Sequence, residues 1–164
     1  MDSLDPKGGA DSGGLRGGTG GAHYGAFVSA KILVVDDEPA YTRLMKMLLS
    51  RTAGYEVMEE NDSTRATATA CAFQPDLVLL DIVMPGMDGG EVAHQIRSTP
   101  DLARVPIMFV SAIAMQDAGR HGIAGRLAEC PFHPKPVQMD KLLASIDRLL
   151  ANTAPERGRT PAGA

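Results

Sequence analysis

The chain has 164 residues, a formal net charge of −4 and 44% hydrophobic residues. This length suits a single domain with tails. The weak negative charge provides no basic surface for nucleic acid, and no apolar run approaches the roughly 18 residues that span a bilayer. Cys71 and Cys130 are far apart, and the chain does not start with a basic segment followed by an apolar one. We therefore expect a cytoplasmic protein with reduced thiols, no membrane insertion and no direct contact with nucleic acid.

The two ends of the chain differ in composition from the part between them. Residues 1–29 hold 9 of the 18 glycines and few aliphatic residues. Such a segment cannot bury enough apolar surface to offset the entropy lost on ordering. We predict a disordered glycine-rich tail over residues 1–29, a folded domain over 30–151 and a second disordered tail over 152–164.

The first half of the predicted domain begins with an aliphatic run, Lys31–Val35, which indicates a buried strand ending in three acidic residues. Pro39 then opens a helix that ends at Gly54 as its C-cap. Its inward face is predicted from the residues at helical spacing, Tyr41, Leu44, Met45 and Leu48. A short polar strand, of the kind found at a sheet edge, is expected over Tyr55–Glu60. A helix capped by Asp62 or Ser63 is expected to run to Ala72.

The second half begins with another aliphatic run, Leu77–Leu80, followed by Asp81 and a Pro-Gly turn. A short helix over Gly90–Ser98 and a strand over Val105–Val110 come next. We expect a short or broken helix over residues 113–129, because glycines recur there and each weakens a helix by about 1 kcal/mol. A brief edge strand among prolines follows, over Pro131–Pro136. The last element is an amphipathic helix over Gln138–Ala151.

This alternation of strands and helices predicts an α/β fold. The arrangement that follows is a doubly wound five-stranded parallel sheet with helices on both faces. In such a sheet, sites lie outside the carboxyl ends of the strands. The residues that follow those ends are therefore the candidates for chemistry.

Three carboxylates, one hydroxyl and one ammonium lie at the predicted strand ends: Asp36, Asp37, Asp81, Ser111 and Lys135. Clustered carboxylates raise each other's pKa, and a divalent cation with oxygen ligands, such as Mg²⁺, would keep them ionised. The metal, the hydroxyl and the lysine suit a phosphoryl group. An aspartate in such a site can act as a nucleophile and form an acyl phosphate.

The order of these motifs closely resembles the receiver domain of two-component response regulators, including the stand-alone chemotaxis type, with its flavodoxin-like fold. The resemblance covers about residues 30–151. The matching segments are Val34-Val35-Asp36-Asp37-Glu38, Leu79-Leu80-Asp81, Met84-Pro85-Gly86-Met87-Asp88-Gly89, Val110-Ser111-Ala112 and Lys135-Pro136. Each motif alone is weak, but all of them in this order are specific.

The resemblance implies a role for each matching residue. Asp81 would accept a phosphoryl group from a phosphohistidine of a histidine kinase or phosphotransfer protein. Asp37, Asp81 and the carbonyl of Val83 would bind Mg²⁺, with Asp36 acting partly through water. Ser111 and Lys135 would contact phosphoryl oxygens, and the Lys135–Pro136 bond would be cis. Phe132 would change rotamer when Ser111 moves, as the second half of a two-state switch.

The expected function is that of a stand-alone response regulator, whose phosphorylation switches a surface that binds another protein. It would phosphorylate and dephosphorylate itself without being a turnover enzyme. Two alternatives stay open. One is an adaptor that keeps the fold but ignores phosphorylation. The other is a hydrolase of the haloacid dehalogenase kind, which the absence of an Asp-x-Asp motif after the first strand disfavours.

The resemblance also implies that the positions two residues after Asp81 and Ser111 tune hydrolysis, because the family varies there. Val83 and Ile113 occupy these positions, and their apolar side chains cannot orient an attacking water. We therefore predict a long-lived phosphoryl group. Met84 and Met87 flank the same site, either as an adaptable contact surface or as loop packing.

Overall fold

The computed structural model describes residues 29–113 and 130–153. Five parallel strands form one sheet, in the order β2-β1-β3-β4-β5. Their bounds are Lys31–Val35 for β1, Glu56–Glu60 for β2, Leu77–Leu80 for β3, Ile107–Ser111 for β4 and Phe132–Pro134 for β5. This is the doubly wound five-stranded sheet predicted from the sequence, with β2 and β5 at its edges.

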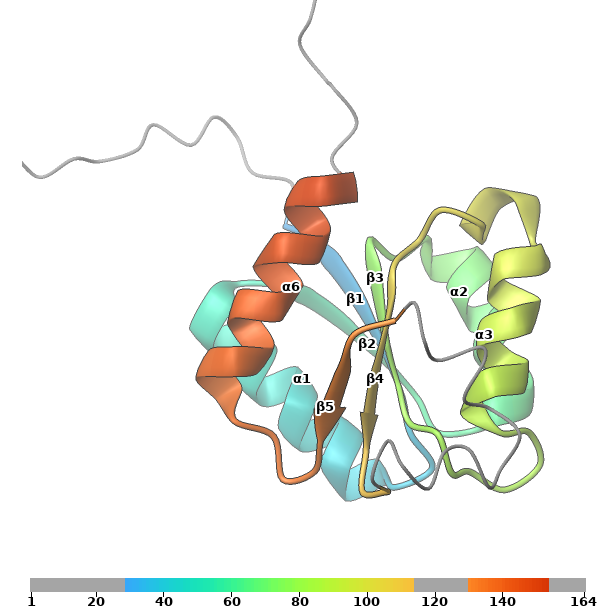
Figure 1. Ribbon diagram of the computed structural model, residues 1–164, viewed down its shortest axis with the longest axis horizontal. Helices are drawn as coiled ribbons and strands as arrows, with labels where there is room; N and C mark the ends of the chain where they lie inside the picture. The colour runs from blue at the N-terminus through green and yellow to red at the C-terminus, as the bar shows by residue number, and fades with distance from the viewer. Residues whose placement is uncertain (1–28, 114–129, 154–164) are drawn as a thin grey trace, which may run out of the picture.

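Helices cover both faces of the sheet, as Figure 1 shows. Helices α1 (Pro39–Ala53) and α6 (Met139–Thr153) lie on one face, and α2 (Ala66–Phe73) and α3 (Gly89–Ser98) lie on the other. No helix in the described ranges is both long enough and apolar enough to cross a membrane. The predicted tails, apart from a few residues next to the domain, and the broken helix over 113–129, apart from its first residue, lie outside the described residues.

The central strands are buried on both faces because alternate side chains enter different cores. Leu33, Val35, Val78 and Leu80 pack under α2 and α3. Ile32, Val34, Leu77 and Leu79 pack under α1 and α6. Continuous aliphatic runs therefore form strands here, and the residue after each run emerges at the end of the sheet.

Helix α1 is rotated from the face that its spacing predicts. Met45 and Leu49 are buried, but Leu44 is 45% exposed, so its predicted place in the core was wrong. The polar Thr42 is fully buried instead. Its hydroxyl group donates to the Pro39 carbonyl, and it lies 3.2 Å from a Glu59 carboxylate oxygen. Polar contacts with the end of β2 thus accompany the observed rotation.

Several predicted boundaries shift by one to four residues. The segment after Asp62 begins as a 3₁₀ turn, Ser63–Arg65, before α2, and the Asp62 side chain accepts from the Thr64 N–H. Strand β4 starts at Ile107 rather than Val105, since Pro106 has no N–H for the ladder. Helix α6 runs to Thr153, two residues past the predicted end and into the predicted tail.

Helix α3 begins with a capping box. The Asp88 side chain accepts from the Glu91 N–H, and the Glu91 carboxylate accepts from the Asp88 N–H. The two methionines of the loop before it are at least partly buried against the core, with Met84 only 8% exposed. Of the two alternatives left by the sequence, this burial favours loop packing over an open contact surface.

Candidate functional site

Asp81 follows β3 directly and is held by its backbone. Its N–H donates to the Val35 carbonyl of β1 at 2.9 Å, which extends the sheet by one residue. One carboxylate oxygen, Oδ1, accepts from the Ile82 N–H at 2.7 Å. The other, Oδ2, lies 3.5 Å from the Lys135 ammonium. The side chain is thus fixed at the sheet end with one oxygen available for chemistry.

Asp36 and Asp37 follow β1, the neighbouring strand. Asp36 is 2% exposed, and its Oδ1 accepts from the Glu38 N–H while its Oδ2 lies 2.5 Å from Lys135 Nζ. Two contacts with the end of β2 hold its backbone: its N–H donates to the Glu60 carbonyl, and its carbonyl accepts from Asn61 Nδ2. Asp37 is exposed at the rim.

The three carboxylates converge as predicted. Asp36, Asp37 and Asp81 each place an oxygen so that these oxygens lie within 4.8 Å of one another. Burial raises the pKa of Asp36, and the charge of Asp81 adds to this, while the hydrogen bond and charge of Lys135 and the Glu38 N–H oppose it. Such an all-oxygen, negatively charged cluster fits Mg²⁺. Bound there, the cation would offset charge on the carboxylates and on a phosphoryl group.

Lys135 directly follows β5, the edge strand on the other side of β3 from β1 and β2. Its N–H donates to the Ser111 carbonyl at 2.9 Å, and its bond to Pro136 is cis, as the resemblance implied. The ammonium contacts both Asp36 and Asp81, and the side chain is 15% exposed. Lysine thus supplies a partly buried positive charge beside the candidate nucleophile.

The remaining site residues predicted from the sequence are Ser111, Val83 and Phe132. Ser111 ends β4 and lines an open cleft of about 550 Å³ together with Val83, Ile113 and the charged residues. Val83 is 50% exposed at the mouth of this cleft. Phe132 on β5 is paired with Phe109 and packs, half-buried, against the core under α2 and α3. It does not line the cleft, and its role as a switch stays a prediction.

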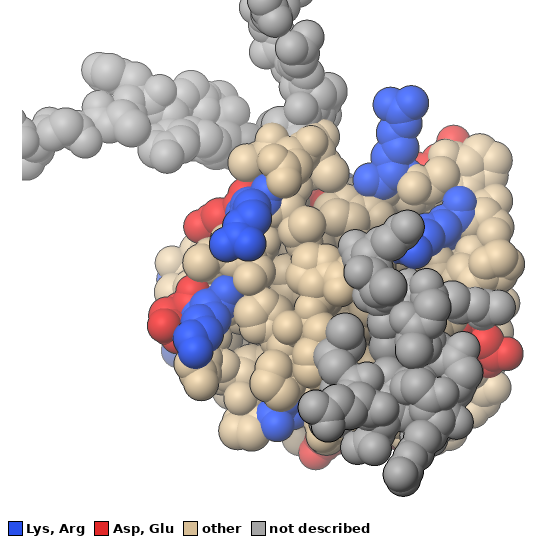
Figure 2. Space-filling view, in the orientation of Figure 1, with Lys and Arg blue, Asp and Glu red and all other residues tan. Residues whose placement is uncertain are grey.

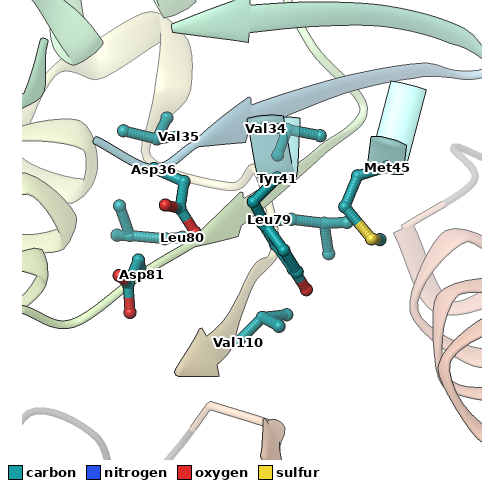
Figure 3. A pocket seen from close by; sticks show the side chains of 9 residues that line it. All are labelled: Val34, Val35, Asp36, Tyr41, Met45, Leu79, Leu80, Asp81 and Val110. Carbon is teal, nitrogen blue, oxygen red and sulfur yellow. The ribbon is translucent and has the colours of Figure 1, made fainter. Parts of the chain in front are cut away.

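Two residues that the sequence did not place in the site, Tyr41 and Asn61, contact its charged residues. Tyr41 of α1 packs its ring against the Lys135 ammonium, 4.1 Å from Nζ to the ring centroid. Figure 3 shows this side chain beside Asp36 and Asp81, running toward Val110. Asn61 joins the Asp36 carbonyl to the Thr42 hydroxyl. No local pattern marks these residues, because each contact joins elements far apart in the chain.

A hydroxyl group fixes the loop that carries Val83. Ser63 Oγ donates to the Pro85 carbonyl at 2.7 Å and accepts from the Met87 N–H at 3.0 Å. The side chain is 3% exposed. Ser63, considered only as a helix cap from the sequence, therefore ties the turn before α2 to the loop after Asp81.

A parallel α/β sheet with an acidic cluster, a hydroxyl and a lysine at the carboxyl ends of its strands is the arrangement expected of a receiver domain. The model of the response regulator receiver domain matches residues 32–147. The chain belongs to this family, as its motifs had indicated.

Curated relatives place the match in the same family. Response regulator MprA of Mycobacterium bovis is 37% identical over 130 residues, covering 79% of this chain and 54% of that protein. The DNA-binding dual master transcriptional regulator RpaA of Synechocystis is 30% identical, covering 75% and 50%. The chain thus spans about half the length of these relatives.

Solved structures agree on the fold. The receiver domain of sensor histidine kinase PA1611 from Pseudomonas aeruginosa, with magnesium coordinated in its active site cleft, superposes with a TM-score of 0.66 at 27% identity, covering 75% of this chain and 98% of that one. Chemotaxis protein CheY4 of Vibrio cholerae gives 0.65 at 26% identity, covering 74% and 98%. The predicted flavodoxin-like receiver fold is confirmed.

Proposed function

We propose that this receiver accepts a phosphoryl group on Asp81 from a phosphohistidine of a histidine kinase or phosphotransfer protein, with Mg²⁺ bound at the acidic cluster. The observation that carries this proposal is the orientation of the Asp81 carboxylate. Oδ1 is bound to the Ile82 N–H, and Oδ2 faces the Lys135 ammonium in a cleft. Oδ2 is therefore the nucleophile.

The transfer of the phosphoryl group forms one bond and breaks one bond at phosphorus. Oδ2 of Asp81 forms the new P–O bond as the P–N bond of phosphohistidine breaks, and the imidazole leaves with the electron pair and takes up a proton. Asp36, Asp37 and the Val83 carbonyl would hold the cation with Asp81. Lys135 would exchange part of its contact with Asp36 for a phosphoryl oxygen, and Ser111 would donate to another.

The same residues support a switch rather than a turnover enzyme. The acceptor belongs to the protein itself, so each cycle changes the protein's own state. We propose that the phosphorylated state is read by another protein. On the face drawn in Figure 2, the visible Lys and Arg side chains lie apart from one another and form no continuous basic stripe. That the protein is a stand-alone receiver domain, as expected from the sequence, stays a prediction. Measuring the size of the native protein would test it.

The test is intact mass after incubation with acetyl phosphate and Mg²⁺. The expected result is a gain of one phosphoryl mass in wild type and none in Asp81→Asn, which keeps the side-chain shape. Equal gain in both would place the acceptor elsewhere. For the adaptor alternative, the deciding result would be a partner that binds phosphorylated wild type and Asp81→Asn equally well.

A further inference from the structure

In the described part of the chain, the Lys135 ammonium contacts three side chains, of which two are proposed metal ligands. It lies 2.5 Å from Asp36 Oδ2 and 3.5 Å from Asp81 Oδ2. The third neighbour is the ring of Tyr41, at 4.1 Å from the centroid. A cation that binds the carboxylates competes with the ammonium for the first two neighbours. It does not compete for the ring.

The ring is placed for a cation–π contact with a partly buried ammonium. Tyr41 projects from the first turn of α1, whose start is fixed by Pro39. Lys135 is 15% exposed, and an ammonium over an aromatic face is attracted more strongly where it is desolvated. Thr42, next to Tyr41, is held by Asn61 and by the Pro39 carbonyl. Asn61 therefore links the backbone of Asp36 to the residue next to Tyr41.

The hydroxyl group of Tyr41 takes no part in this arrangement. It is the buried side-chain polar atom that lacks a hydrogen-bond partner among the described residues. It points toward Val110, along an apolar lining that includes Met45 and Leu79 (Figure 3). Among the described residues, the contact of Tyr41 with the charged site is therefore made by its ring and not by its hydroxyl.

We propose that Tyr41 is a positioning residue whose ring holds the Lys135 ammonium in the site when a divalent cation takes over the Asp36 and Asp81 carboxylates. In the metal-free protein the carboxylates already hold the ammonium, and the ring adds little. Once their charge is neutralised by the cation, the ring becomes the main partner. This inference rests on the proposed function for the identity of the cation and the phosphoryl group.

The sharpest test varies the electron density of the ring while keeping its shape. Tyr41 is replaced in the full chain by phenylalanine and by increasingly fluorinated phenylalanines, and the Kd for Mg²⁺ is measured by titration calorimetry. We expect Tyr41→Phe to bind Mg²⁺ nearly as well as wild type. The most fluorinated ring should bind roughly three- to tenfold more weakly, with a graded series between them.

Tyr55 offers a matched control. Its hydroxyl donates to Asp147 on α6, away from the acidic cluster. Tyr55→Leu should lower the melting temperature without changing the Kd for Mg²⁺, whereas Tyr41→Leu should weaken Mg²⁺ binding. A Kd that ignores fluorination in variants with wild-type circular dichroism would overturn the proposal.

A second readout follows the lysine itself. The side-chain protons of Lys135 should be shifted upfield by the Tyr41 ring in NMR spectra, and this shift should persist or grow when Mg²⁺ is added. A shift that disappears with Mg²⁺ would show that the ammonium leaves the ring, against the proposal. Neither readout requires phosphorylation, so failure here and failure of Asp81 as acceptor can be told apart.

Discussion

Gly89, the first residue of α3, lies directly against the backbone carbonyl of Asp81. A Cβ at position 89 would be 2.1 Å from that oxygen and 2.9 Å from the Ile82 Cα. The Gly89 N–H also donates to the Ile82 carbonyl at 2.8 Å. The start of the helix and the candidate acceptor are thus in contact through their backbones, with no room for a side chain at position 89.

Gly89→Ala should therefore displace α3 or the Asp81 backbone. We expect a loss of about 2–4 kcal/mol in the free energy of unfolding and little phosphorylation by acetyl phosphate. Gly54→Ala is the control: it has open space around its Cβ but a φ of +70°, so it should cost about 1 kcal/mol and leave phosphorylation intact. Denaturant unfolding and intact mass check both variants. Wild-type levels of phosphorylation in Gly89→Ala would contradict this prediction.

The Ser63 hydroxyl should stabilise the loop after Asp81. Ser63→Ala leaves the Pro85 carbonyl and the Met87 N–H without this partner, so we expect a loss of about 1–3 kcal/mol in stability. Weaker Mg²⁺ binding should accompany it, because the loop carries the Val83 carbonyl. Ser98→Ala, at an exposed position, should change neither quantity. Chemical unfolding and calorimetric Mg²⁺ titration measure the two effects.

The raised pKa of Asp36 predicts how metal-free protein responds to pH. The unfolded chain ionises this carboxyl at a lower pH than the folded protein, so the folded state is favoured below the unfolded pKa. The contribution of Asp36 to the free energy of unfolding should fall as the pH rises from about 4 toward the folded pKa, and then level off. In EDTA, Asp36→Asn should lack this contribution. Urea unfolding at a series of pH values from about 4 upward measures this loss of stability. Added Mg²⁺ should remove the loss.

The phosphoryl group on Asp81 should be long-lived. Val83 and Ile113 line the cleft, and their apolar side chains cannot orient a water for hydrolysis. We expect phosphorylated protein in Mg²⁺ buffer to last for minutes or longer, and Val83→Asn to shorten its lifetime several-fold. Phosphate release after removal of acetyl phosphate reports both rates. A wild-type half-life of seconds would refute this hypothesis.

The sequence was sufficient to predict what depends on local pattern. Apolar runs marked the central strands. The residues that follow the strands, including Asp81 and Lys135, meet at the carboxyl ends of the strands. Contacts that depend on helix rotation were missed. Leu44 was placed in the core because spacing cannot show that Thr42 turns inward to contact Glu59. Tyr41 was read as a core residue, since its contact with Lys135 appears only after the chain has folded.

The two edge strands also determine how copies of this protein can meet. β2 carries Glu56, Glu59 and Glu60, and β5 is three residues long. Pro131 precedes β5 and Pro134 ends it, so neither residue can donate to a further strand. Charges, proline and short length all discourage edge-to-edge pairing. A second copy would gain few ladder hydrogen bonds from either edge, so self-association should use helical faces and not a continuous sheet across two molecules.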